Sequence, residues 1–378
     1  MLAVKLNGAY EWQTGNKSQA DDASINSYEL GLTSSLMFPR ILAPRFVRKE
    51  SYRYDNRTTF QLSASLLNRP QYFRMLSFGG QVAWDFQTSP VSYHNLTMFK
   101  MTYNRLLSTT DRFESLMEDR ERLRRSFDSQ FIPSASYTYT LDKRVGRGGR
   151  NRIVWQTTGS IAGNILAGAY SVAGKKGQQK IFGVPFFQYV KATTEFKYNI
   201  KLTDGLHLAT RIMVGAGHPY GNMDIMPYLE QFSVGGANSI RAFTIRSIGP
   251  GSFRDEEEEK KGNFGQVGNF KLEANAELRF RIVGDLHGAV FLDAGNIWDL
   301  TEDPSRPGSK FTGRNFLNEL ATGTGIGVRY DLSFLVLRLD CGIGIHTPYK
   351  NPEKRGYYNI GSFWDKGLGL HLAIGYPF

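Results

Sequence analysis

The chain has 378 residues, 40 of them glycine, with 13% aromatic residues and a formal net charge of +11. This length suits two ordinary domains or one large barrel, and the glycine and aromatic content favours strands and turns over helices. Lysine and arginine are spread along the chain and the cluster 119–125 mixes both signs, which indicates a solvated loop or short helix and no nucleic-acid surface. One cysteine, Cys341, and no Cys/His ligand spacing predict neither a disulfide nor a metal or cofactor site.

The N-terminal stretch lacks the pattern of a signal peptide, because Lys5 interrupts its apolar residues and no small-residue cleavage site follows. The longest uncharged run, 155–174, has about the length of a membrane-spanning helix. It is rich in Gly, Thr, Ser, Asn and Gln, so we do not expect it to form one.

Alternation of apolar and polar residues predicts strands from one end of the chain to the other. It is present in 1–13 and recurs in 190–201, 206–216, 273–283 and 334–346. In this way we count about 14 strands. Their expected first residues are 2, 27, 57, 72, 92, 131, 151, 187, 205, 270, 285, 321, 333 and 366.

Many of these segments are about 10 to 14 residues long, above the usual globular strand of about 5 or 6 and sufficient to cross a membrane. Short connections such as 88–90 and 202–205 alternate with long ones such as 107–130 and 217–269. A soluble β-sandwich also alternates, but with shorter strands and no sorting of its loops. We therefore expect residues 1–378 to form one all-β domain. We expect this domain to be a transmembrane antiparallel β-barrel whose apolar face meets lipid and whose charged face lines a wet lumen.

Two residues near the end of the chain are expected on the apolar face. Cys341 is in phase with Leu339, which indicates an inert, lipid-facing thiol. Phe378 is in phase with Leu372 and Ile374, as expected of an aromatic anchor at the membrane interface.

Three motifs follow one another in the second half of the chain. The loop motif consists of Gly235, Gly236, Ser239, Ile240, Arg241, Ala242 and Phe243, with Ser-Ile-Gly-Pro at 247–250. The next strand carries Asn-Ala-Glu-Leu-Arg-Phe at 275–280, and the strand after it carries Phe291, Asp293 and Gly295 at alternate positions. By these motifs and their order, the chain resembles the BamA/TamA superfamily of outer-membrane assembly factors, also called bacterial surface antigens. The resemblance is strong over 217–378 and mostly architectural over 1–216.

The resemblance implies a barrel of about 16 strands preceded by periplasmic POTRA domains. The sequence shows fewer strands and no such domain, so we expect the C-terminal portion of a longer protein that lacks the first two strands of the barrel.

In this family the long loop folds back into the barrel, and its arginine meets the aspartate of the strand motif. The resemblance therefore implies that Arg241 contacts Asp293. The alternation agrees, because Asp293 shares a face with Phe291 and Gly295. A solvated loop arginine is the alternative. Ala242 stands where the family has glycine, which costs about 1 kcal/mol if the backbone there needs a positive φ.

Other residues around the motifs have expected places. Glu277 and Arg279 face the lumen, where they either join the Arg241 pair or pair as ordinary lumen charges. Gly235 and Gly236 allow the chain to reverse. Three glycines on the inward face of one strand leave room for the loop or relieve crowding: Gly323, Gly325 and Gly327. The acidic run 255–259 lacks the spaced ligands of a calcium loop and indicates a solvated loop apex.

The resemblance implies a factor that inserts proteins into the outer membrane of a Gram-negative bacterium. It acts through a lateral seam between the first and last strands, where an incoming strand pairs with the exposed edge. We assign the last strand, 368–378, to this seam, with Gly369 and Gly375 weakening its pairing and Phe378 at its end. The implied partners are nascent outer-membrane proteins, outer-membrane lipids, and periplasmic or lipoprotein assembly partners.

A secretion pore and an enzyme are the two other functions to consider. Two-partner secretion transporters share the arginine loop and the barrel, so a polypeptide-conducting pore is the alternative. An enzyme is not predicted, because the sequence has no Gly-x-Ser-x-Gly motif and no histidine in the context of a nucleophilic serine.

Overall fold

The computed structural model describes residues 1–11, 27–42, 55–70, 72–118, 121–174, 177–181, 183–254, 266–351, 356–358 and 368–378. One antiparallel sheet of 15 strands dominates the fold. Its strands are β1 (Leu2–Glu11), β2 (Ser27–Phe38), β3 (Arg57–Arg69), β4 (Phe73–Ser89), β5 (Ser92–Thr109), β6 (Gln130–Val145), β7 (Asn151–Ala162), β10 (Tyr189–Thr203), β11 (Leu206–Pro219), β12 (Phe270–Val283), β13 (Leu286–Trp298), β14 (Ala321–Asp331), β15 (Val336–Asn351), β16 (Gly356–Tyr358) and β17 (Leu368–Ile374).

The remaining elements lie in the connections. They are β8 (Lys180–Ile181), β9 (Val184–Pro185), α1 (Asp111–Met117), α2 (Glu121–Arg125), α3 (Asn164–Val172) and the short 3-10 turns η1 (Arg147–Gly149), η2 (Tyr228–Glu230) and η3 (Phe316–Glu319). In the part of the chain that the structure describes, no helix combines the length and the hydropathy needed to cross a membrane. The uncharged run 155–174 divides between the end of β7 and α3.

All predicted strands are present, and the largest offset is that of β15, expected at 333 and observed from Val336. The additional strand of the main sheet is β16, which has three residues and pairs with β15. The prediction succeeded because a two-residue period is a local property of the sequence.

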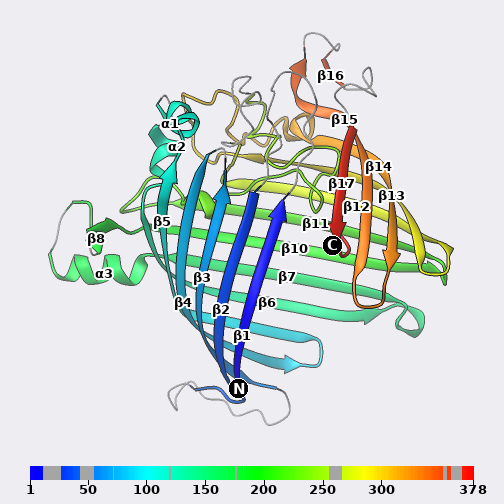
Figure 1. The fold of residues 1–378 in the computed structure, drawn as a ribbon, viewed down its shortest axis with the longest axis horizontal. Coiled ribbons are helices and arrows are strands. Elements are labelled where there is room, and N and C mark those ends of the chain that lie inside the picture. Colours follow the sequence, from blue (N-terminus) through cyan, green and yellow to red (C-terminus); the bar gives the residue numbers. More distant parts are fainter. Residues whose placement is uncertain are drawn as a thin grey trace.

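Neighbouring strands of the sheet follow one another in the chain, and β17 pairs with β15. Within the described residues, β1 pairs with β2 alone and β17 with β15 alone, so the expected closure between first and last strands is not seen there. The sheet curls instead, so that β1 and β17 lie on the same side while β6, β7, β10 and β11 cross behind them (Figure 1).

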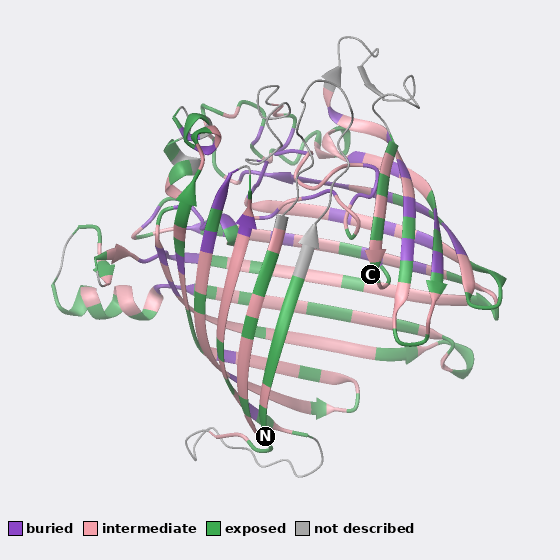
Figure 2. Cartoon of the chain, viewed as in Figure 1, coloured by how far each residue is buried: buried purple, intermediate pink, exposed green. Residues whose placement is uncertain are grey.

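The two faces of the sheet differ in the way predicted for a membrane wall. On β13, Val290 and Leu292 are 45% and 53% exposed, whereas Phe291 and Asp293, which alternate with them, are buried. Figure 2 shows such alternating bands on the strands near the C-terminal edge. Exposed apolar side chains opposite buried charges invert the pattern of a soluble protein, as lipid on one side and a polar interior on the other require.

The predicted separation of short turns to one end of the sheet and long loops to the other is only partly present. Short turns at 204–205 and 284–285 lie at one end of the sheet, and long connections such as 220–269 lie at the other. Two connections reverse this rule. Three residues join β3 to β4 at the long-loop end of these strands, and 18 residues join β2 to β3 at the short-turn end.

Apolar clusters join the long connections over one end of the sheet. The first consists of Tyr72, Phe73, Met75, Phe113, Met117, Phe127, Tyr228 and Val267. The second consists of Ile132, Ala162, Phe187, Tyr189, Met223, Ile225 and Met226. Arg125 ends α2, in the cluster predicted to be a solvated loop or a short helix, and its Nη2 donates to Asp224 at 2.7 Å. The connection after β11 takes part in every one of these contacts, so it is anchored at the loop end. The acidic run 255–259 lies outside the described residues.

Candidate functional site

The loop motif is a narrow reversal of the chain. Gly235 and Gly236 have φ values of 99° and 89°, the left-handed region that glycine adopts without strain. Gly236 N–H donates to the Phe243 carbonyl at 2.8 Å, and Arg246 N–H donates to the Val234 carbonyl at 2.9 Å. These bonds bring the two arms together, so that the residues between them form a compact tip.

Arg241 lies at this tip and is fully buried. Its Nε and Nη2 donate to the two carboxylate oxygens of Asp293 at 2.8 and 2.9 Å, and its main-chain N–H donates to Oδ2 at 3.0 Å. The structure thus brings together the two residues whose contact the family resemblance implied. A bidentate contact of this kind is both strong and directional.

The charge on Arg241 is maintained by its surroundings. Burial favours the neutral form, but the hydrogen bonds and charges of Asp293 and Glu277 outweigh burial and hold the pKa of Arg241 above its usual value. The guanidinium is therefore a permanent cation in the interior.

The strand motif on β13 meets the loop tip with three alternate residues. The Phe291 ring lies under the guanidinium, with its centroid 3.6 Å from Cζ of Arg241. Asp293 supplies the carboxylate. Gly295 supplies space, because a methyl group there would lie 3.3 Å from Cδ1 of Ile240 and 2.7 Å from a main-chain oxygen of β12. Ile240 is itself buried, so the tip is seated by packing as well as by charge.

Strand β12 holds the tip from its side. Ser239 Oγ donates to Glu273 at 2.7 Å and accepts from Gly235 N–H at 3.1 Å. The Asn275 amide donates to the Ser239 carbonyl and to Asp293, both at 2.9 Å. Each polar residue of the tip therefore has a partner on the wall, as buried polar groups require.

Glu277 connects the pair to a larger network, as expected for an inward-facing carboxylate. It is fully buried and accepts from Arg241 Nη1, from Arg279 Nε at 2.7 Å and from Arg329 Nη2 at 3.0 Å. One carboxylate thus faces three guanidinium groups that come from the loop, β12 and β14.

Three members of this network were not singled out from the sequence. Arg329 Nη1 lies 2.6 Å from Asp340, and Arg338 Nη1 lies 3.4 Å from the same carboxylate. Arg338 also donates to the Asn238 amide oxygen at 2.6 Å, so β15 contacts the loop directly. Alternation marks these residues as inward-facing, since Arg338 and Asp340 are out of phase with the apolar Leu339. It does not reveal that they meet, because strand register is not a local property.

A row of glycines provides the floor beneath the tip. Register places Phe291 opposite Gly325, Gly325 opposite Gly342, and Gly342 opposite Gly369, on four strands from β13 to β17. A Cβ on Gly342 or Gly369 would lie 2.8 or 2.7 Å from the main-chain oxygen of Arg241. The wall therefore lacks side chains where the main chain of Arg241 lies against it.

Ala242 fits this floor without strain. Of the described non-glycine residues, only Arg246 and Ser333 have positive φ, so the cost anticipated for alanine does not arise. Its methyl group lies against Gly323, where a Cβ would collide with it. Of the two roles considered for Gly323, making room for the loop is the one observed.

The end of the chain differs from the prediction. Strand β17 ends at Ile374, and Gly375, with φ of 85°, turns the backbone beyond it. The Phe378 ring then lies 5.6 Å from Cζ of Arg279 and 5.9 Å from that of Arg241. The predicted interfacial anchor is wrong, because the turn breaks the two-residue period and sends Phe378 to the lumen side. Gly375 lies one residue beyond the strand, and its N–H still donates to the carbonyl of Val336 on β15 at 2.8 Å.

Replacing Glu277 with glutamine should destabilise the folded protein by about 2 to 4 kcal/mol, since three buried guanidinium groups lose their shared anion. Chemical unfolding of the purified protein measures this change. The control is Glu29→Gln on β2, where the glutamate is exposed. Equal effects of the two substitutions would show that the network does not stabilise the fold.

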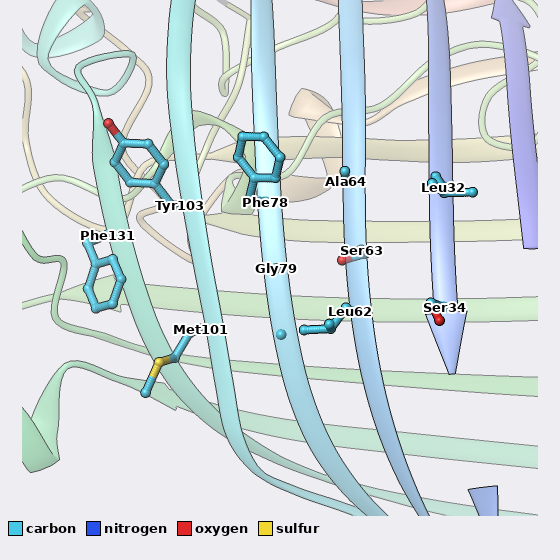
Figure 3. Close-up of a pocket in the computed structure, with 11 residues that line it drawn as sticks. Leu32, Ser34, Leu62, Ser63, Ala64, Phe78, Gly79, Met101, Tyr103 and Phe131 are labelled. Carbon is cyan, nitrogen blue, oxygen red and sulfur yellow. The ribbon is translucent and has the colours of Figure 1, made fainter. Parts of the chain in front are cut away.

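A recess of about 550 Å³ lies elsewhere, on strands β2 to β6 (Figure 3). It is lined by Leu32, Ser34, Leu62, Ser63, Ala64, Phe78, Gly79, Gly80, Met101, Tyr103 and Phe131. It has no charged residue, and several of its apolar side chains belong to the exposed, lipid-type face. We therefore do not assign the recess to the site around Arg241.

Comparisons with known proteins agree with this architecture. BamA of Neisseria meningitidis serogroup B, an outer membrane protein assembly factor, is 28% identical over 159 residues. Those residues cover 41% of this chain and 18% of that relative, so the match spans less than a fifth of its length.

One solved structure shows the same fold. BamA from Haemophilus ducreyi lacking POTRA domains 1–3 superposes with a TM-score of 0.60 at 14% identity, covering 98% of this chain and 70% of that one. CdiB from Escherichia coli gives a TM-score of 0.48 at 13% identity, covering 94% and 53%. The family model of the Omp85 superfamily domain matches residues 3–364. The chain therefore belongs to the Omp85 superfamily, whose members are outer-membrane β-barrel proteins of Gram-negative bacteria.

Proposed function

We propose that this chain is the barrel of a factor that inserts β-barrel proteins into the outer membrane, through a lateral seam and without covalent chemistry. The observation that carries the proposal is the buried loop tip, which Arg241 bonds to Asp293 on the wall. Membership of the Omp85 superfamily and similarity to a BamA assembly factor support the same function.

The last strand has the properties of a seam. β17 has seven residues and pairs with β15, which has 16, and its other edge is unpaired within the described residues. Exposed strand edges present main-chain N–H and C=O groups that pair with an incoming strand. The proposed clients are nascent outer-membrane proteins, whose strands would add to this edge, while membrane lipid covers the apolar face. Periplasmic or lipoprotein partners complete the proposed assembly.

The loop tip keeps the wall beside this seam in shape. It contacts β12 through Asn275, β13 through Asp293 and β15 through Arg338. Contacts to several strands at once resist the bending that a half-paired sheet edge otherwise undergoes. We call the contact between Arg241 and Asp293 the latch. Its proposed role is to hold a rigid surface against which a client strand is aligned.

Site-specific photo-crosslinking in the full-length protein tests this function. The protein is placed in phospholipid vesicles, and insertion of an unfolded reference β-barrel protein is followed by its protection from protease. A crosslinker at Leu370 on β17 should capture the inserting protein. The matched control is Ile326 on β14, which belongs to the same face and is similarly exposed, at 64% against 54%.

Capture from Ile326 as strong as from Leu370, or insertion without capture from Leu370, would contradict the seam. The secretion alternative predicts a different position, because a transported polypeptide passes through the lumen. Capture of a polypeptide from Lys197, whose charged side chain pairs with Glu195 on the inward face of β10, would support that alternative instead.

A further inference from the structure

The inner face of β17 carries a single side chain that can form hydrogen bonds. Its inward residues are Gly369, His371 and Ala373, and the outward ones are leucine and isoleucine. His371 Nε2 lies 2.7 Å from the main-chain oxygen of Arg241. Since a carbonyl oxygen only accepts, the ring is the donor and carries its proton on Nε2.

Arg241 consequently bridges two strands that are not neighbours. Its main-chain N–H donates to Asp293 on β13 at 3.0 Å, and its carbonyl accepts from His371 on β17. Strands β14 and β15 separate β13 from β17 in the sheet. The residue that latches the loop therefore also reaches the last strand.

Residues of the sheet also make room for the contact between His371 and the Arg241 carbonyl. Gly342 and Gly369 leave the space into which the Arg241 carbonyl projects, since a Cβ on either would lie 2.8 or 2.7 Å from that oxygen. His371 faces Asp340 directly across the strand pair, but that carboxylate lies against Arg329 and Arg338. Of these two groups, the carbonyl of Arg241 is the one that forms a hydrogen bond with His371.

We propose that His371 is a positioning residue that ties the last strand to the motif loop. An edge strand paired over seven residues on one side opens readily, and one added hydrogen bond to a buried carbonyl limits that opening. When an incoming strand displaces β17, the same bond transmits the movement to the loop. The second statement rests on the proposed function, whereas the tie itself does not.

Hydrogen–deuterium exchange of the full-length protein in vesicles tests the tie. In His371→Ala the β17 amides should exchange about fivefold faster, the usual effect of one hydrogen bond, while β12 and β13 exchange as before. His371→Gln keeps an amide donor and should restore most of the protection. His346→Ala on β15 is the matched control, because His346 also lies against a main-chain oxygen, that of Leu320, at 2.7 Å.

Unchanged β17 exchange in His371→Ala overturns the tie, as does an equal acceleration in His346→Ala. These readouts do not depend on client insertion, so they stand even if the proposed function fails. Transmission is tested separately by the insertion rate. His371→Ala should change that rate severalfold with His371→Gln closer to wild type, and an unchanged rate overturns transmission.

Discussion

Arg241→Ala should lower the free energy of unfolding of the full-length protein by about 3 to 5 kcal/mol, the usual result of breaking a buried ion pair. The cause is that Asp293 and Glu277 are fully buried and lose a guanidinium that each contacts. The stability of Arg241→Lys should lie between that of the wild type and that of Arg241→Ala. Lysine keeps the charge but lacks the planar guanidinium that meets both oxygens of Asp293. Chemical unfolding followed by circular dichroism measures the three proteins.

An exposed ion pair provides the control for Arg241. Arg57 Nε lies 2.8 Å from Asp85, and the two side chains are 58% and 28% exposed. Exposed pairs of this kind contribute about 0 to 1 kcal/mol, so Arg57→Ala should leave stability nearly unchanged. If Arg241→Ala shifts unfolding no more than Arg57→Ala does, the latch does not stabilise the barrel wall.

Gly342→Val should expel the loop tip from its seat. A Cβ at this position would lie 2.8 Å from the Arg241 carbonyl oxygen and 3.0 Å from two main-chain atoms of Ala242. Overpacking of this kind costs about 1 to 3 kcal/mol or forces the backbone to move. Because main chain meets main chain here, we expect movement, with loss of the Arg241–Asp293 contact. Trypsin, which cleaves after arginine, should then cut the motif loop at Arg241 in the folded protein.

Gly159→Val is the matched control for this substitution. Gly159 lies on β7, and a Cβ there would meet no atom within 4 Å. The control should keep the loop resistant to trypsin and the unfolding transition near that of the wild type. Protection of Arg241 in Gly342→Val equal to that in Gly159→Val would refute the idea that the glycine row seats the loop.

Several features of the site were predictable because they depend on short motifs. Arg241 and Asp293 each lie in a motif of the family, and alternation put Asp293, Glu277 and Arg279 on the inward face. The contributions of Phe291 and Gly295 could not be derived in the same way, since a ring beneath a guanidinium and a space for Ile240 exist only once the loop is seated.

Two expectations, the interfacial position of Phe378 and the strain at Ala242, were wrong because they depended on backbone angles. In the sequence Phe378 continues the alternating pattern, but β17 ends at Ile374, the chain turns at Gly375, and the Phe378 ring lies near Arg279. Ala242 appeared strained by comparison with the family's glycine, yet its φ is ordinary and its methyl group rests on Gly323. A residue's identity does not reveal the backbone angle that it adopts in a loop.

By itself, the sequence determined the strands, their lipid-facing and inward faces, and the positions of the two motifs, because a two-residue period and short motifs are local. The contact between Arg241 and Asp293 was implied by the family resemblance. Only the tertiary structure decided what meets across strands. Register aligned Gly325, Gly342 and Gly369 into one floor, and it gathered Arg329, Arg338 and Asp340 around the latch. Register depends on hydrogen bonds between segments far apart in the chain. The glycine floor and the bond from His371 to Arg241 therefore cannot be predicted from any one segment.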